Sequence, residues 1–218
     1  MKEETKLRLV IIMLNLGVST CLALAAVPSS YAAQTIIDEW STIKPPPAPE
    51  LKSVITDPKV TALLVLDIQK QICAPTRPRC IASIPTIQGL LTRARAKGMP
   101  VIHSLGRGTV ADIHAAVAPQ SDEPVVTSGP DKFRGTDMEK ILKEKGVTTV
   151  IVVGTGANGA VLFTSGSAAL RGLKVIVPVD GMSADDPYIE QYSAWHLLNA
   201  PGVRTQVTLT KIDMIQFP

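Results

Sequence analysis

The sequence has 218 residues, of which 45% are hydrophobic and 19% are charged. These proportions are ordinary for a globular protein and exclude an intrinsically disordered chain. The 22 basic and 19 acidic residues give a formal net charge of +3, and aromatic residues make up only 4%. Because a nucleic-acid surface needs a dense basic patch, we expect no nucleic-acid partner.

The first 32 residues have the organisation of a secretory signal. Basic residues precede an apolar stretch from Leu9 to Ala26, and small residues follow at Ser30 and Ala32. This order predicts cleavage after Ala32 and places the mature protein in the periplasm or outside the cell. Two alternatives stay open. The stretch is long enough to remain as an uncleaved anchor, and Cys21 loosely resembles a lipoprotein attachment site.

Two cysteines follow the signal segment, Cys73 and Cys80. An even pair in an exported chain predicts a disulfide bond, because exported proteins fold in oxidising surroundings. The alternatives are two unrelated buried thiols, or Cys73 as a free nucleophile.

The residues between the two cysteines, 74–79, contain two prolines and no helical periodicity. They predict a loop that overhangs the end of the preceding strand. A disulfide would hold Arg77 and Arg79 in a defined place, where either could meet a carboxylate on a substrate. In the alternative interpretation the bond only closes an exposed loop, and both arginines face water.

A proline-rich stretch divides the rest of the chain. Residues 44–49 read Lys-Pro-Pro-Pro-Ala-Pro, which cannot form a helix and predicts a stiff, extended linker. We therefore expect an N-terminal extension over residues 33–59 and one domain over residues 60–218.

From residue 60 onward, strand and helix patterns alternate. The run at 62–66 is apolar throughout, as in a strand buried on both faces. The predicted strands span 62–66, 100–103, 124–126, 149–153, 174–179 and 206–210. The predicted helices span 84–94, 136–145, 158–170 and 188–198. Strict alternation implies an α/β fold, a parallel sheet with helices on both faces.

In such a sheet, ligands bind beyond the carboxyl ends of the strands. Four features are predicted to lie there: Asp67, His103, the turn at Gly154 and Asp180.

The turn reads Gly-Thr-Gly-Ala-Asn-Gly over residues 154–159 and fits the dinucleotide pattern G-x-G-x-x-G. Asp180 even stands roughly where a ribose-binding acid would. However, the pattern belongs to the first strand–helix unit rather than a late one, and an exported protein meets little nicotinamide cofactor. We therefore favour a tight turn with close backbone packing, and we expect no cofactor.

Asp67 follows a buried strand directly, and Gln69 comes two residues later. The core behind a carboxylate at this point partly desolvates it, which suits it to carry a proton. A structural cap for the next helix is an equally good interpretation. Lys132 precedes a predicted helix N-terminus, where the helix dipole disfavours a cation; a solvated surface lysine is the commoner case.

Three motifs in the same order and spacing resemble those of the isochorismatase-like cysteine hydrolase superfamily: residues 64–69, 133–138 and 152–164. The resemblance covers roughly residues 60–212. It implies a three-layer α/β/α sandwich with a mainly parallel sheet. It also implies a pocket in which an Asp and a Lys activate a Cys that attacks an amide or nitrile-like carbon.

Carried over to this chain, the resemblance makes Asp67 the acid and places Ala160 where the nucleophilic Cys would be. The family lysine would fall near Thr127 or Ser128, so either Lys132 reaches the pocket or the lysine role is empty. Isochorismatases carry a small residue at the Cys position and cleave a vinyl ether by proton donation and water attack. By that resemblance Asp67 would be the general acid, and Lys132 would hold an anionic group.

Two classes of function follow. The first is an exported hydrolase of a small molecule, in which Asp67 works as general acid/base without a cysteine nucleophile. The second is a small-molecule-binding protein that has lost its chemistry. The predicted catalytic residues are Asp67 and Lys132. The predicted substrate contacts are Gln69, His103, Gly156, Ala157, Asn158 and Ala160. The three histidines are too scattered to predict a metal site, and assembly into a homo-oligomer stays open.

Overall fold

The computed structural model describes residues 35–218. The predicted signal segment, its cleavage site and Cys21 lie outside the described residues. A short helix, α2 (Ile36–Glu39), is followed by the proline-rich stretch, which contains no helix or strand. Residues 47–218 form one compact unit. Among residues 35–218, none of the helices combines the length and the apolar character that crossing a bilayer requires.

The unit is built on a parallel sheet in the order β4-β3-β2-β5-β6-β8, with the short β7 paired to the end of β5. The strands are β2 (Thr61–Leu66), β3 (Val101–Leu105), β4 (Val125–Thr127), β5 (Thr149–Thr155), β6 (Lys174–Pro178), β7 (Met182–Ser183) and β8 (Val207–Thr210). Every neighbouring pair in it is parallel, as the alternating pattern predicted.

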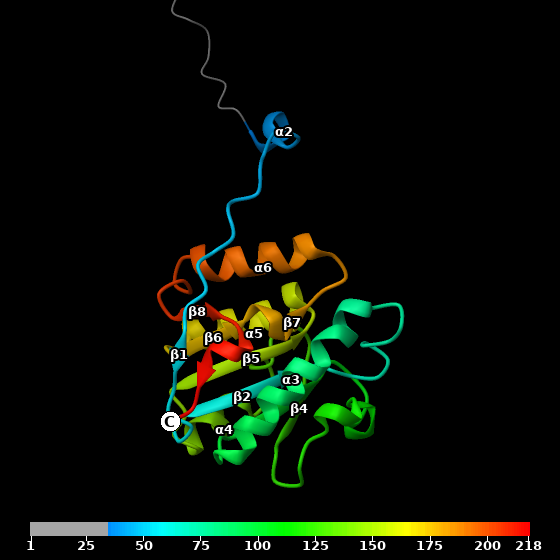
Figure 1. Ribbon diagram of the computed structural model, residues 1–218, viewed down its shortest axis with the longest axis vertical. Coiled ribbons are helices and arrows are strands. Elements are labelled where there is room, and N and C mark those ends of the chain that lie inside the picture. Colours follow the sequence, from blue (N-terminus) through cyan, green and yellow to red (C-terminus); the bar gives the residue numbers. More distant parts are fainter. Residues whose placement is uncertain (1–34) are drawn as a thin grey trace, which may run out of the picture. The chain divides into compact units, whose positions relative to one another are not determined.

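Helices cover both faces of the sheet (Figure 1). They are α3 (Pro78–Ala96), α4 (Met138–Glu144), α5 (Leu162–Leu170) and α6 (Pro187–Asn199). In β2, Leu64 and Leu66 pack with buried residues of α4, α5 and α6, whereas Leu63 and Val65 pack with α3. This alternation follows from the period of two along a strand. The predicted α/β/α sandwich is therefore confirmed.

Short turns of helix complete the connections. They are η1 (Val110–Asp112), η2 (Ala115–Val117), η3 (Ala157–Val161), η4 (Val179–Gly181) and η5 (Ile212–Met214). The turn η3 runs directly into α5, with a kink at Gly159. It begins just beyond the carboxyl end of β5.

The structure differs from the predicted boundaries at three places. A two-stranded sheet pairs β1 (Val54–Ile55) with β9 (Ile215–Gln216), so the compact unit begins before the predicted boundary at residue 60. The strand β3 continues past His103 to Leu105. The helix α3 begins at Pro78, earlier than predicted, because proline is well suited to the first turn of a helix.

Candidate functional site

Asp67 lies immediately beyond the carboxyl end of β2, at the edge of the sheet where ligands bind in folds of this class. Its φ angle of 55° is the one left-handed value among the non-glycine residues described. Asp tolerates this conformation better than most residues. The resulting sharp turn is closed by a hydrogen bond from the backbone N–H of Gln69 to the carbonyl oxygen of Asp67, at 2.9 Å.

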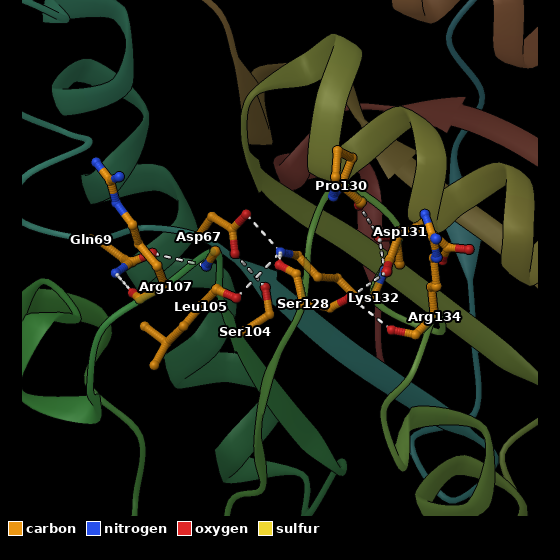
Figure 2. Close-up of polar contacts among 12 residues, drawn as sticks. Asp67, Gln69, Ser104, Leu105, Arg107, Ser128, Pro130, Asp131, Lys132 and Arg134 are labelled. Carbon is orange, nitrogen blue, oxygen red and sulfur yellow. Dashed lines mark hydrogen bonds and ion pairs between the residues drawn. The ribbon is translucent and has the colours of Figure 1, made fainter.

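The carboxylate of Asp67 is held by two side-chain donors. The Ser104 hydroxyl donates to Oδ1 at 2.7 Å, and Lys132 Nζ lies 2.8 Å from Oδ2. Both donors point at the carboxylate in Figure 2. Two such donors are the partners that an ionised carboxylate prefers. The Asp67 side chain is 11% exposed, so it keeps a narrow contact with solvent.

Lys132 is completely buried. Its Nζ also donates to the carbonyl oxygens of Ser128, at 2.9 Å, and Leu105, at 3.4 Å. The loop that carries it is fixed to α5, because the backbone N–H of Lys132 donates to Thr164 Oγ1 at 3.2 Å. Of the two alternatives drawn from the sequence, the structure shows the first: Lys132 reaches Asp67.

Gln69 is fully buried, and both ends of its amide are bonded to the loop after β3. Nε2 donates to the carbonyl oxygen of Arg107 at 2.8 Å, and Oε1 accepts from the backbone N–H of Gly106 at 3.0 Å (Figure 2). A methyl group built at Gly106 would lie 3.7 Å from Asp67 Oδ2. Gln69 therefore holds the loop that covers Asp67.

His103 does not join this group. Its Nε2 lies 2.9 Å from Glu123 Oε2, and Arg95 of α3 binds the same carboxylate. Val101 and Leu105 of β3 pack with α3, so His103, which alternates with them, points to the same side, whereas Ser104 points to the opposite side and meets Asp67. Burial lowers the pKa of His103 below 6.5, against the opposing hydrogen bond to Glu123.

Glu123 has two opposing influences on its pKa. Burial alone would raise the pKa, but the hydrogen bonds from Arg95, the backbone of Gln120 and His103 lower it from 4.5 to about 2. Arg95, Glu123 and His103 thus form a separate ionic cluster on the α3 side of the sheet.

The glycine-rich turn after β5 packs against β2. A Cβ atom at Gly154, where φ is 135°, would lie 2.1 Å from the carbonyl oxygen of Leu66, so only glycine fits there. Asp180 has a structural contact, because its Oδ1 accepts from the backbone N–H of Ile212 at 2.9 Å. Both observations favour the tight-turn interpretation over a dinucleotide site.

The predicted contact residues of this turn lie on η3 and just before it. Ala157 and Ala160 are buried in the same apolar cluster as Leu66 and Phe133, whereas Asn158 is exposed and Gly156 half-buried. Sequence spacing places Ala160 one turn before Thr164, the side chain that binds the Lys132 loop. A methyl group thus stands where the resemblance puts a nucleophile.

Cys73 and Cys80 are joined by a disulfide bond, and both are buried. It links the loop after Asp67 to the first turn of α3. Within residues 35–218 no free thiol therefore remains. No group of three or more His, Cys, Asp or Glu side chains in this part of the chain is arranged to hold a metal ion.

Sequence reasoning missed Ser104 and Ser128. The predicted second strand ended at His103. A prediction that extended this strand by one or two residues would have placed Ser104 beside Asp67. Ser128 binds Lys132 through its backbone carbonyl oxygen. Every residue has such a carbonyl, so the residue type gives no sign of this contact.

Comparison with known proteins places the chain among related sequences. Residues 61–208 match the family described as "Isochorismatase domain". A "Secreted isochorismatase effector Isc1" from Verticillium dahliae is 32% identical over 117 residues, covering 48% of this chain and 62% of that protein. A "Streptothricin hydrolase" from Streptomyces noursei is 30% identical over 140 residues, covering 58% of this chain and 56% of that protein. The chain thus spans about three-fifths of the length of these relatives.

Solved structures share the fold. An isochorismatase family protein from Desulfovibrio vulgaris superposes with a TM-score of 0.65 at 24% identity, covering 71% of this chain and 95% of that one. A cysteine hydrolase from Pseudomonas syringae superposes with a TM-score of 0.64 at 25% identity, covering 76% of this chain and 95% of that one.

Proposed function

The chain belongs to the isochorismatase family, whose domain description matches residues 61–208, and on this premise we propose that it is an exported hydrolase of a small molecule. Asp67 acts as general acid/base and water is the nucleophile. The observation that carries the proposal is the buried ion pair of Asp67 with Lys132, at a strand end and still in narrow contact with solvent.

In the proposed reaction Asp67 serves first as general base and then as general acid. The ionised Asp67 takes a proton from water as the water oxygen bonds to the electrophilic carbon of the substrate, and it returns that proton to the leaving atom as the old bond breaks. Lys132 keeps its own protons. Its role is to hold Oδ2 in place and to balance the charge, while Ser104 fixes the orientation through Oδ1.

A thiol mechanism has no support among residues 35–218. Ala160 offers only a methyl group, and Cys73 is bonded to Cys80. A thiolate is the nucleophile in cysteine hydrolysis, and in the proposed reaction water takes its place.

Export is supported by three observations. The first 32 residues follow the order of a cleaved secretory signal, and a disulfide is typical of exported proteins. In addition, one relative is named a secreted effector.

The experiment uses residues 33–218 and a panel of small amides, enol ethers and cyclic acids. We expect Asp67→Asn to lower the turnover of any substrate found by about 100-fold or more, because general acid/base catalysis contributes that much. Asn also tolerates the left-handed backbone of residue 67. Because the substitution leaves the buried Lys132 ammonium without its counter-ion, a urea denaturation curve of the variant is recorded beside its turnover, and turnover is compared under conditions in which the variant is folded. The matched control is Asp122→Asn at an exposed carboxylate. Turnover that survives at the native level in Asp67→Asn would remove this residue from the mechanism.

A second candidate is a small-molecule-binding protein without catalysis, and Ala160 is the observation that favours it. In that case members of the panel would raise the melting temperature without being consumed. Product formation by the native protein, lost in Asp67→Asn, would exclude this alternative.

A further inference from the structure

One arginine at the ligand-binding edge of the sheet keeps part of its guanidinium available. Arg77 Nε donates to Asp185 Oδ1 at 2.5 Å. Within residues 35–218 this is the only side-chain hydrogen bond of Arg77, so neither Nη atom has a protein acceptor in the described part of the chain. The end of a guanidinium that bears both Nη atoms binds carboxylates with two parallel hydrogen bonds.

This free end lies beside the turn after β5. A methyl group built at Gly156 would be 3.9 Å from Arg77 Nη2 and 3.6 Å from Asn158 Oδ1. Gly156 follows β5, and Asp67 follows β2, the neighbouring strand, in which Leu66 pairs with Gly154. Arg77 and the Asp67–Lys132 pair therefore belong to adjacent strand ends.

Arg79 is used differently, although it is two residues away. Its Nε donates to Glu190 Oε1 at 2.9 Å, and its Nη2 pairs with Oε2 of the same carboxylate. Glu190 also accepts from the backbone N–H of Ala184 at 2.9 Å. Arg79 thus ties α3 to α6. Its Nε and Nη2 atoms are both occupied by the Glu190 carboxylate, so this arginine is a poorer candidate than Arg77 for binding a ligand.

The backbone of Arg77 is fixed on both sides. Its N–H donates to the carbonyl oxygen of Ala74 at 2.8 Å, and its carbonyl accepts from the N–H of Cys80 at 3.0 Å. The Cys73–Cys80 disulfide encloses the segment. A fixed backbone reduces the entropy lost when the side chain binds a ligand.

Asp185, the one partner of the Arg77 side chain among residues 35–218, is weakly held. The Asp185 side chain is 66% exposed, and ion pairs on the surface are weak because water and salt screen them. Asp185 therefore holds the guanidinium weakly through Nε, and its negative charge competes only weakly with a ligand carboxylate at the Nη end.

From these contacts we propose that Arg77 binds a carboxylate on the substrate, and that Asp185 competes for the same guanidinium when no substrate is bound. The substrate class is then a small carboxylic acid whose hydrolysable bond reaches Asp67. This inference rests on the proposed hydrolase function.

The test compares benzoate with its uncharged counterpart benzamide, by calorimetric titration of residues 33–218 at fixed ionic strength. We expect the native protein to bind benzoate about tenfold more tightly or better, because hydrogen bonds between a guanidinium and a carboxylate are stronger than those to a neutral amide. Arg77→Gln should remove this preference, and Asp185→Asn should strengthen benzoate binding. Arg204→Gln, at an exposed arginine before β8, is the matched control and should change neither dissociation constant.

A benzoate preference that survives in Arg77→Gln would overturn the inference, as would its absence from the native protein or a weaker affinity in Asp185→Asn. The outcome is separable from the hydrolase proposal. If Asp67→Asn abolishes turnover while Arg77→Gln keeps the preference, only the carboxylate site is wrong. If Arg77→Gln loses the preference but no substrate is turned over, only the catalytic proposal fails.

Discussion

The Nζ atom of Lys132 lies 2.8 Å from Oδ2 of Asp67, and the lysine side chain has no exposed surface. The other acceptors of the ammonium group are the carbonyl oxygens of Ser128 and Leu105. Removing one partner of a buried ion pair leaves the other charge desolvated and uncompensated, which costs more than the pair itself contributes. Each of the two side chains therefore depends on the other.

Lys132→Met should lower the free energy of unfolding by about 3–5 kcal/mol, as measured by urea denaturation. The double variant with Asp67→Asn should recover much of this loss, because the carboxylate charge is then absent as well. Lys140→Met is the control. Lys140 Nζ lies 4.0 Å from Glu144 Oε1, and both side chains are exposed, so this substitution should change the free energy of unfolding by no more than about 0.5 kcal/mol. Additive losses in the double variant would contradict the coupling.

The sequence was sufficient to predict where Asp67 lies, because a continuous apolar run ends at this acid, and the structure places it directly after β2. It was also sufficient for the sheet and its covering helices, since β2 and β5 carry continuous apolar runs, are buried throughout, and alternate with the helices. These features depend on local periodicity, which a sequence displays directly.

The partners of Asp67 were harder to predict because they depend on contacts distant in the sequence. Whether Lys132 is solvated or buried is decided by how its loop docks on Thr164 of α5, and no local pattern encodes that docking. The interpretation of His103 depended on the end of β3. The strand continues two residues past His103, so Ser104 lies beside the end of β2, and neighbours along a strand point to opposite faces, so Ser104 rather than His103 meets Asp67.

Stability should depend on pH through the cluster of His103 and Glu123. The pKa of His103 is lowered below 6.5 by burial, so the unfolded chain binds a proton there before the folded chain does. The free energy of unfolding should therefore fall as the pH drops below 6.5, with a slope of up to about 1.4 kcal/mol per pH unit.

Glu123 contributes in a lower range, because its pKa falls from 4.5 to about 2 on folding. Its contribution is fully present above pH 4.5 and is lost as the pH falls from there towards 2. Denaturation curves measured between pH 8 and pH 3 test both ranges. His103→Gln should remove the loss of stability that begins below pH 6.5 and keep the loss that begins below pH 4.5. Equal stability of the native protein at pH 7 and pH 5 would exclude the role given to His103.

Ala160→Cys tests whether the surroundings of the family nucleophile remain polar. If Asp67 and Lys132 shape that position, the pKa of the new thiol should fall well below the free value of about 8.5. The pH dependence of thiolate absorbance measures it, and the native protein contributes no thiol from residues 35–218 because both cysteines there are bonded. Ala96→Cys, at an exposed position near the end of α3, supplies the ordinary value. An equal pKa in both variants would favour the binding protein over the hydrolase.

The disulfide between Cys73 and Cys80 should stabilise the exported protein by restricting its unfolded chain. The ring it closes is short, with a sequence separation of 7, so the double variant Cys73→Ser/Cys80→Ser should lose about 2–3 kcal/mol of unfolding free energy if the loop-closure account holds. Mass spectrometry of folded, unreduced protein after alkylation tests the bond itself, and we expect neither cysteine to be modified. Two alkylated cysteines would contradict the bond and make Cys73 available again as a nucleophile. They would also free the segment that fixes Arg77, so the same sample should then show no preference for benzoate over benzamide.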